Sequence, residues 1–440
     1  MMKLSIQNES EVLNNKAKNR KIITIYRILS YDLIFYYTIS YLFLVNVKGL
    51  TTAQIVFADS FYPLFKLIFQ IPCTLFIQKF GKRNSLIVSN IAVAIFVLLT
   101  IGLIDTFTMI ISNFFLAFAF VIKAMAESTI LYDSLEDTPN KREQFTKYEG
   151  KSAAGYFFLE AITSLGTGFL YVINPYVPLI ICLLVTIFTV FLSAMLHEIP
   201  TSNEEIVHHS AKEQFKKHFK DLGIAFKFIL KSKRLRALIL YNSLMASLMF
   251  LTNTFRRSLL DDVGVSSEYF GIIFTIFGIV ASISATKSYS IHKAYTNKTL
   301  TLIGLSYTIS IIVYGAVVLL KLPLFLMYYL LLLAFAINYI MKGPFYTLIK
   351  QYLNSFCNSD MRLKIYSANL FIEYISSTIL SLICSWIMGY YSNAMTTFIL
   401  GLISTGAMIA LLIYMSSRVG LKPEEYSKDD ICYDEQPVEN

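Results

Sequence analysis

Five charged side chains lie near the middle of long apolar stretches of this chain. They are Asp32, Lys66, Glu160, Lys342 and Glu373. A charge at the centre of a bilayer costs about 2.5–3.5 kcal/mol unless it faces water or a partner. The protonation state of a carboxyl at such depth responds to a neighbouring cation, so the group can carry a proton. We therefore expect a carboxylate of this set to exchange a proton against a lysine counter-charge, although each residue could instead form a structural bond between helices.

Lys342 has additional support, because Gly343 and Pro344 follow it directly. A proline removes a backbone donor and kinks a helix. Broken helix at membrane depth is tolerated where it is buried in protein or lines a cavity. The sequence thus predicts an interruption beside Lys342.

Further polar residues form a secondary set of cavity candidates. Asp59 and Lys66 are seven residues apart on one helical face, and Lys123 and Glu127 have the four-residue spacing at which side chains pair. Aromatic and amide side chains near these charges would suit a moderately apolar organic solute, with helix packing or an interfacial belt as the alternative. These residues are Tyr36, Tyr156, Asn338 and Tyr339.

Twelve apolar stretches must position these residues. The chain is 55% hydrophobic and 15% charged, with mean hydropathy +0.58, and each stretch has the roughly 20 residues that a membrane-crossing helix needs. We therefore expect an all-α integral membrane protein. The predicted spans are 22–46, 53–78, 84–103, 107–132, 146–173, 176–196, 235–259, 267–290, 298–320, 323–350, 363–390 and 394–417.

The distribution of Lys and Arg predicts the orientation. One side of the predicted membrane collects most of them, whereas the opposite connections hold Lys48, Lys321, Arg256 and Arg257. The positive-inside rule makes the richer side cytoplasmic, so both termini are expected in the cytoplasm and the protein in the cytoplasmic (plasma) membrane. The net charge of +9 then reflects topology and gives no reason to expect nucleic acid.

The spans fall into two halves around a long polar segment. We expect a cytoplasmic segment at 1–21, six-helix bundles at 22–196 and 235–417, a cytoplasmic linker at 197–234 and a cytoplasmic tail at 418–440. LeuAlaPheAla occurs at 116–119 and again at 333–336, and Glu160 and Glu373 recur at nearly the same separation. These repeated sequence features favour a parallel duplication of a six-helix unit.

This arrangement of six spans, a basic loop and six spans resembles the major facilitator superfamily over essentially the whole chain. The loop after the second helix supports the resemblance through Lys79, Gly81, Lys82 and Arg83, although Thr74 and Gln78 stand where that family has Gly and Asp. The resemblance implies that these four residues belong to the cytoplasmic gate. The resemblance implies the major facilitator fold and alternating access. It also implies that charges in the next cytoplasmic loop re-pair as the halves rock, with a solvated loop as the alternative; these are Asp133, Arg142 and Glu149.

The linker segment 211–228 places Phe215, Phe219, Leu222 and Phe226 on one side of a basic helix. Such a helix is expected to lie on the inner leaflet and contact membrane lipid, the alternative being a free linker. The five Cys lack metal-ligand or disulfide spacing, and no phosphate-cradling loop occurs. We expect no metal, no cofactor and no enzymatic activity.

These patterns together predict a monomeric secondary active transporter that moves a small organic solute, coupled to a proton or another cation. Export of an amphiphilic compound by proton coupling is favoured. One alternative is cation-coupled uptake of a sugar, peptide or metabolite. Another is a membrane receptor on a transporter scaffold that binds its ligand without moving it.

Overall fold

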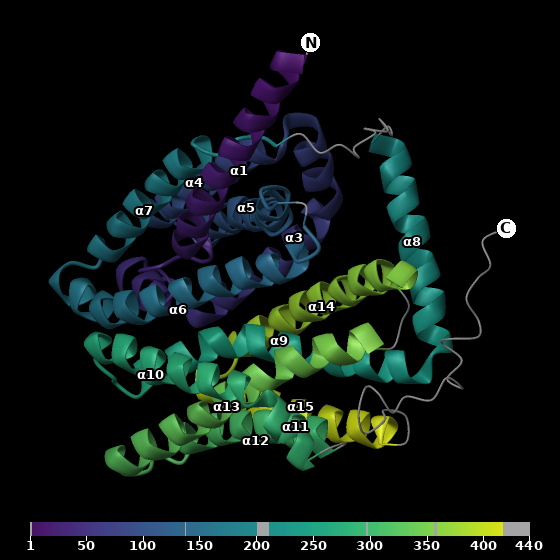
Figure 1. The fold of residues 1–440 in the computed structure, drawn as a ribbon. Coiled ribbons are helices and arrows are strands. Elements are labelled where there is room, and N and C mark those ends of the chain that lie inside the picture. Colours follow the sequence, from purple (N-terminus) through teal and green to yellow (C-terminus); the bar gives the residue numbers. More distant parts are fainter. Residues whose placement is uncertain (1, 137, 200–210, 296–297, 356–358, 417–440) are drawn as a thin grey trace. The chain divides into compact units, whose positions relative to one another are not determined.

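The computed structural model describes residues 2–136, 138–199, 211–295, 298–355 and 359–416, and within them the chain is helical, without strands. Figure 1 shows the arrangement of the helices. In chain order they are α1 (Met2–Ser30), α2 (Ser40–Leu42), the π-helix η1 (Phe43–Val47), α3 (Thr52–Phe80), α4 (Lys82–Ile101), α5 (Thr106–Asp133), α6 (Lys141–Ile173), α7 (Val177–Ala194), α8 (Ala211–Lys231), α9 (Lys233–Asp262), α10 (Ser267–Thr286), α11 (Ser288–Tyr295), α12 (Thr299–Leu319), α13 (Leu324–Ser355), α14 (Ser359–Met388) and α15 (Asn393–Met415).

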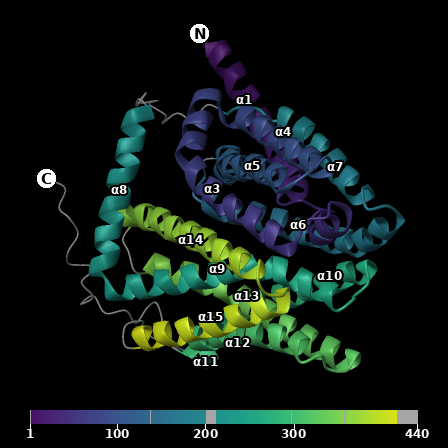
Figure 2. The same cartoon turned by 180° about the vertical axis from the view of Figure 1, so that it is seen from behind.

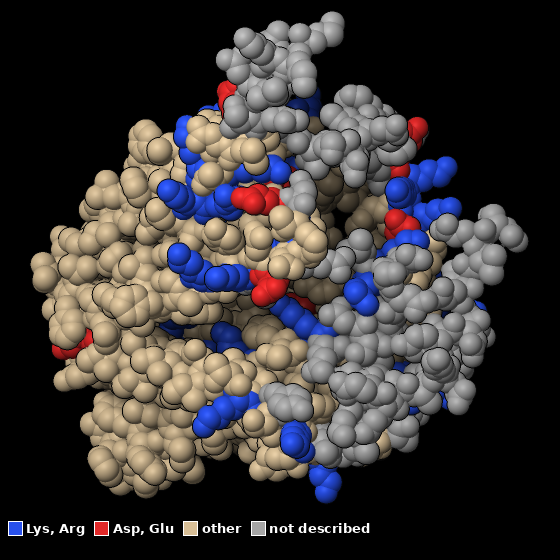
Figure 3. Space-filling view, viewed as in Figure 1, with Lys and Arg blue, Asp and Glu red and all other residues tan. Residues whose placement is uncertain are grey.

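Eleven helices in the described part of the chain are long and apolar enough to cross a membrane. They correspond to the predicted spans two to twelve and confirm the all-α membrane fold. Many large apolar side chains on them are exposed, such as Phe158, Ile173 and Phe325. In Figure 3, Lys and Arg gather toward the N-terminal segment and the middle of the face, while broad areas are formed by other residues. Exposed apolar helix sides of this kind suit contact with lipid.

The first predicted span, 22–46, is the exception, because the structure interrupts it. Helix α1 ends at Ser30, nine non-helical residues follow, and the short α2 and η1 complete the segment. The prediction of one continuous helix is therefore wrong. The interruption contains Asp32 and is described with the candidate site below.

Side-chain caps fix several helix starts where the sequence places short polar residues. The Asp105 carboxylate accepts hydrogen bonds from the Thr108 backbone N–H at 2.8 Å and from its hydroxyl at 2.7 Å, and these bonds hold the pKa of Asp105 below its usual value. Ser232 caps α9 through the Leu235 N–H at 3.2 Å, and Ser392 caps α15 in the same manner. These caps separate helices at the polar turns that the hydropathy pattern indicated.

The chain divides into two compact units. Unit 1 comprises Met1–Leu50, Phe65–Gln214 and Ser267–Thr275, and unit 2 comprises Thr51–Leu64, Phe215–Ser266 and Ile276–Asn440. In unit 1, α4 packs between α5 and α7, and in unit 2, α12 packs against α13 and α15. The predicted bundle bounds 22–196 and 235–417 stay a prediction.

Small residues bring helices of unit 2 into close contact. A Cβ on Gly315 of α12 would lie 2.5 Å from the Ala394 carbonyl oxygen of α15, and one on Gly401 of α15 would lie 2.6 Å from the Ile312 nitrogen. Glycine is needed at both positions because no side chain fits. Such backbone contacts are typical of membrane helices, where dispersion and packing replace the hydrophobic effect.

Helices α3 and α10 each contribute residues to both units. In unit 1, Gly271 of α10 lies so close to α6 that a Cβ would meet the Ser164 carbonyl oxygen at 2.1 Å, and Thr275 donates to the Ala161 carbonyl at 3.2 Å. In unit 2, the Ser385 hydroxyl of α14 donates to the Ala53 carbonyl of α3 at 2.8 Å. The first part of α10 thus contacts α6, and the first part of α3 contacts α14, while the predicted duplication stays a prediction.

Helix α8 confirms the predicted helix in the linker, but its apolar side is divided. Leu222 is buried, and Phe226 lies edge-on to Phe371 of α14 with ring centroids 5.7 Å apart, while Phe215 and Phe219 are exposed. Figure 1 and Figure 2 both show α8 beside the end of α14. The expectation that all four apolar residues face lipid is wrong for Leu222, because α8 packs on the protein at its C-terminal end.

Candidate functional site

The interruption after α1 places Asp32 in non-helical backbone. The Asp32 carboxylate accepts a hydrogen bond from the Leu33 N–H at 2.9 Å, which gives this backbone donor a partner outside the helix. Phe35 has φ +66°, a left-handed conformation that a bulky residue rarely adopts. Such backbone persists only where surrounding packing fixes it, and strained positions cluster at functional sites. Among the predicted cavity residues, Asp32 is therefore the one with the most unusual backbone surroundings.

A small cavity of about 10 Å³ joins Asp32 to Lys123 of α5. Ser30, Cys182 and Thr186 also line it. This volume is close to the smallest that holds a water molecule, and the lining is polar enough to bind one. The positive charges of Lys123 and Lys66 both act on the Asp32 carboxylate. The structure thus brings together three of the predicted charges within unit 1.

Tyr156 of α6 connects Asp32 to Glu160. Its buried ring stacks on Tyr31 with centroids 4.7 Å apart, and its hydroxyl interacts electrostatically with both carboxylates. Gly155 permits this approach, since a Cβ there would lie 2.6 Å from Ile28 of α1. Tyr36, another predicted residue, is buried edge-on against Phe96 and Tyr37.

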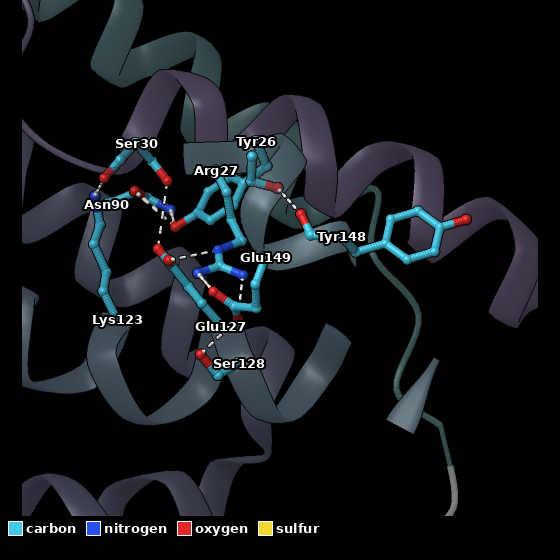
Figure 4. Close-up of polar contacts among 10 residues, drawn as sticks. Tyr26, Arg27, Ser30, Asn90, Lys123, Glu127, Ser128, Tyr148 and Glu149 are labelled. Atoms are coloured by element: carbon cyan, nitrogen blue, oxygen red, sulfur yellow. Dashed lines mark hydrogen bonds and ion pairs between the residues drawn. The ribbon is translucent and has the colours of Figure 1, made fainter. Parts of the chain in front are cut away.

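A cluster of charged residues lies at the last turns of α1, just before Asp32 in the chain. Figure 4 shows Arg27 pointing between two glutamates. Arg27 donates from Nη1 to Glu149 Oε1 at 2.5 Å and from Nη2 to Glu149 Oε2 at 2.7 Å, while its Nε lies 3.6 Å from Glu127 Oε2. Ser30 donates to Glu127 at 3.3 Å, and Ser128 donates to Glu149 at 3.2 Å. We call Arg27, Ser30, Glu127, Ser128 and Glu149 the Arg27 cluster. It joins α1, α5 and α6 by a bidentate, charge-assisted pair, a strong arrangement in a buried setting.

Lys123 and Glu127 interact electrostatically, as their spacing predicted, but their closest polar contacts are made with α1. Lys123 donates to the Ser30 backbone carbonyl at 3.3 Å, and Glu127 turns to Arg27. Partners on α1 are closer than the neighbour on the same helix, because both side chains are buried against α1 and must satisfy more than one hydrogen-bonding position.

The loop between α3 and α4 holds several of the predicted gating residues. Gly81 has φ +83° and precedes α4, whose first N–H groups, those of Lys82 and Arg83, donate to the Glu198 carboxylate at 2.9 and 3.0 Å. A carboxylate at a helix N-terminus is favoured by the helix dipole. Lys82 forms an ion pair with Asp133 at 2.8 Å. Glu198 and Asp133 thus supply negative charge near the position where Gln78 replaces the family's Asp.

Lys79 and the side chain of Arg83 take no part in these ion pairs. Lys79 is exposed, with its ammonium 5.4 Å from the centroid of the Phe80 ring, and Arg83 also donates from Nε to the Ala194 carbonyl at 3.2 Å. The side chain of Arg142 lies outside the described residues. A surface pocket of about 650 Å³ opens beside this loop between Lys18, Asn84 and Glu198, and it shares no lining residue with the Asp32 cavity.

In unit 2, Glu373 of α14 accepts a hydrogen bond from an asparagine amide. Asn242 of α9 donates to Glu373 Oε2 at 3.3 Å and to Asn369 Oδ1 at 3.1 Å. Tyr346 and Tyr374 lie close enough to interact electrostatically with the carboxylate. Asp59 also belongs to unit 2, whereas Lys66 on the same helix belongs to unit 1.

Lys342 does not lie at a helix break. Helix α13 continues through Pro344, so the predicted interruption is wrong. Gly343 packs against α10, where a Cβ would meet the Ala285 nitrogen at 2.7 Å. Lys342 and Tyr339 lie one turn apart, with the ammonium 5.9 Å from the ring centroid. Asn338 is buried and donates to the Tyr307 carbonyl at 3.3 Å.

Three functional candidates were missed by the sequence analysis, namely Arg27, Glu198 and Arg256. Arg27 stands within the first predicted span, so its depth was a usable signal. Arg256 was assigned to a polar connection, but the structure buries it on α9. Glu198 follows the sixth predicted span, and nothing in its local sequence indicates that it caps α4.

Among the described residues, no three His, Cys, Asp or Glu side chains lie close enough together to hold a metal ion. The described cysteines Cys73, Cys182 and Cys384 are free and buried. The arrangement offers buried carboxylates with lysine neighbours, aromatic walls and ion pairs between helices. Such groups can bind and exchange protons and ions.

Comparison with known proteins gives the family. Residues 23–355 match the model of the Major Facilitator Superfamily. The uncharacterized MFS-type transporter YxaM of Bacillus subtilis (strain 168) is 22% identical over 230 residues, which cover 52% of this chain and 55% of YxaM, so the match spans little more than half of that relative.

Solved structures show the same fold. The nucleoside transporter NupG superposes with a TM-score of 0.68 at 12% identity, over 94% of this chain and all of NupG. A D-xylose–proton symporter superposes with a TM-score of 0.65 at 12% identity, over 92% of this chain and 98% of the symporter. With its apolar helices, buried ion pairs and family match, the chain belongs to the Major Facilitator Superfamily and is a multi-pass membrane transporter, not an enzyme.

Proposed function

We propose that this transporter moves a small organic solute across the cytoplasmic membrane by proton-coupled alternating access, with export favoured. The observation that carries the proposal is Asp32, a carboxylate in interrupted helix that shares a water-sized cavity with Lys123. Interrupted helix at membrane depth occurs where the backbone lines a cavity, often at the binding site of a transporter.

The proton would be exchanged at Asp32. When the carboxylate is ionised, Lys123 and Lys66 neutralise it, and when it takes up a proton, their charge becomes available to another partner. Tyr156 and Glu160 extend this polar group along α6. Glu373, held by Asn242 in unit 2, is the second coupling candidate.

The Arg27 cluster and the pair between Lys82 and Asp133 are proposed to stabilise one state of the transport cycle. Both lie where helices adjoin basic segments that are predicted to be cytoplasmic. Opening would require these pairs to separate and re-form elsewhere. Solvated pairs shift a conformational balance by about 1 kcal/mol or less, and buried pairs by more. The side chains of both pairs are largely shielded from solvent, and Arg27 has two carboxylate neighbours, so the Arg27 cluster would contribute the larger share.

Export of an amphiphilic compound accords with the aromatic surroundings of Asp32, including Tyr31, Tyr37 and Tyr156. Cation-coupled uptake is the second candidate, because one structural neighbour is a D-xylose–proton symporter. In either case we propose a monomeric protein with cytoplasmic termini. The exposed Phe215 and Phe219 of α8 are proposed to contact lipid.

The test is collapse of a pH gradient in inverted vesicles that contain the protein, challenged with cationic, neutral and anionic compounds. We expect one compound class to collapse the gradient and the effect to disappear in Asp32→Asn. Glu160→Gln and Glu373→Gln, run in parallel, show whether these carboxylates share the coupling. Unchanged collapse in all three variants would overturn the assignment, and binding without flux for every compound would favour a receptor.

A further inference from the structure

Arg256 of α9 is a buried cation whose hydrogen-bond partners are all neutral. It is 3% exposed, and it donates from Nη1 to Thr252 Oγ1 at 3.1 Å and from Nη2 to Asn253 Oδ1 at 2.7 Å. Its Nε has no hydrogen-bond partner. Among the described residues of unit 2, no carboxylate forms an ion pair with Arg256, and the groups that interact with it are Thr252, Asn253 and tyrosines. Arginine is almost never buried without an opposite charge, because desolvation of the cation is then uncompensated.

The surroundings of Arg256 add a second unmatched donor. The Tyr314 hydroxyl is buried, forms no hydrogen bond of good geometry and lies close enough to Arg256 to interact with the guanidinium electrostatically. The Arg256 guanidinium lies 4.8 Å from the centroid of the Tyr339 ring, and Lys342 approaches the same ring. We call Thr252, Asn253, Arg256, Tyr314 and Tyr339 the Arg256 cluster. All of its members belong to unit 2.

The chemistry that would complete this cluster is that of an anion. A water molecule could accept hydrogen bonds from the guanidinium and the tyrosine hydroxyl, but it would not compensate the positive charge. A carboxylate or phosphate oxygen would do both, by charge-assisted hydrogen bonds. The Tyr339 ring also stacks on Phe277 with centroids 5.2 Å apart, so an aromatic surface adjoins the cation.

We propose that the Arg256 cluster binds the anionic group of the transported solute, an organic acid with an apolar or aromatic part. This proposal rests on the proposed function and names its substrate class. Arg256 would hold the carboxylate or phosphate, Tyr314 would donate a further hydrogen bond, and Tyr339 would contact the apolar part. Asn253 and Thr252 position the guanidinium.

The test is the thermal unfolding midpoint of the purified full-length protein in detergent, with benzoate, phenyl phosphate, benzamide or chloride as probe. A ligand that binds only the folded protein stabilises it by RT ln(1 + [L]/Kd), so at equal ligand concentration the tighter ligand raises the midpoint further. Benzoate and benzamide have nearly the same shape and differ in charge. We expect benzoate and phenyl phosphate to bind about 10–100-fold more tightly than benzamide, the factor that charged hydrogen bonds provide.

Matched variants assign the effect to the cluster. In Arg256→Gln the stabilisation by benzoate and phenyl phosphate should be lost, whereas Arg257→Gln, which removes the same charge at the next residue, should keep it. Tyr314→Phe deletes only the unmatched hydroxyl and should weaken benzoate binding without loss of the fold. This variant keeps the test decisive even if Arg256→Gln folds poorly.

Equal stabilisation by benzoate and benzamide, retention of the benzoate effect in Arg256→Gln, or no stabilisation by either organic anion would each overturn the proposal. A chloride effect as large as that of benzoate would overturn the assignment to an organic solute. Loss of anion binding in Arg256→Gln while compound-driven pH collapse continues unchanged would reject this inference and leave the proposed function intact. Failure of the proposed function is recognised separately, by absence of collapse in the wild type or unchanged collapse in Asp32→Asn.

Discussion

Two buried arginines, one in each unit, have opposite electrostatic surroundings. Arg27 is placed between Glu149, which it binds through two nitrogens, and Glu127 at 3.6 Å. Arg256 is equally buried but is surrounded by a threonine, an asparagine and tyrosine rings. The first cation carries its counter-charge within the chain, and we propose that the second receives it from the solute. Burial of an arginine therefore does not by itself show whether its charge is compensated within the protein; its partners decide that.

The largest expected effect comes from breaking the complete cluster. Arg27→Gln removes the bidentate cation of the partly buried Glu149 and one of the two positive neighbours of the buried Glu127, and loss of one partner from a buried pair costs about 3–5 kcal/mol. The thermal unfolding midpoint should fall sharply. Arg20→Gln is the control, because Arg20 pairs with the largely exposed Glu136 and its loss should change stability by less than about 1 kcal/mol. Equal effects of the two substitutions would show that the Arg27 cluster is not a strong buried pair.

Removing one carboxylate from the same cluster should cost less. Glu149→Gln keeps the shape of the side chain and a hydrogen-bond acceptor but loses the charge opposite Arg27. Glu127 remains to compensate part of that charge, so we expect a loss of about 1.5–3 kcal/mol, the value of a charged hydrogen bond. The midpoint of thermal unfolding again measures it, and a cost equal to that of Arg27→Gln would mean that Glu127 contributes nothing.

A carboxylate can also be added to the incomplete cluster. Asn253→Asp places a negative charge on the atom that now accepts from Arg256 at 2.7 Å, with almost no change in shape. Since Asn253 is exposed, the stability gain should be modest, about 1 kcal/mol. Stabilisation by benzoate should disappear because the internal carboxylate competes for the cation. Undiminished benzoate binding in Asn253→Asp would contradict the proposal that Arg256 lacks a counter-charge within the protein.

The smallest effect concerns a neutral partner in the complete cluster. Ser128→Ala removes one hydrogen bond to Glu149, of 3.2 Å, while both bonds from Arg27 remain. We expect a loss of about 0.5–1 kcal/mol, which unfolding of the variant beside the wild type should resolve. A loss comparable to that of Glu149→Gln would show that the hydroxyl, and not the ion pair, fixes this carboxylate.

The membrane fold could be predicted from the sequence, because each span needs only length and hydropathy. The helix interruption could not. The segment from Asp32 to Ile39 contains neither Gly nor Pro, and its apolar and aromatic residues resemble those of the uninterrupted spans. Its left-handed Phe35 depends on packing from other helices. Pro344 gave the opposite error, since α13 continues through a residue that usually ends or kinks a helix.

The same limit applies to the charges. The spacing of Lys123 and Glu127 predicted a pair on one helix, but both side chains are buried against α1, where closer partners are available. Arg256 lies near the end of its predicted span, so hydropathy assigned it to a connection. Local spacing identifies charged residues at depth, whereas their partners depend on tertiary contacts that one sequence does not contain.

The most direct measurement compares the thermal unfolding midpoints of Arg27→Gln and Arg256→Gln in the same detergent, without added organic anion. Our account predicts opposite outcomes. Arg27→Gln should unfold at a much lower temperature than the wild type, and Arg256→Gln at an equal or higher temperature, because it removes a buried charge that has no counter-charge in the described structure. If both variants lose similar stability, Arg256 is a structural residue whose charge is already compensated within the protein. The proposed difference between Arg27 and Arg256 is then wrong.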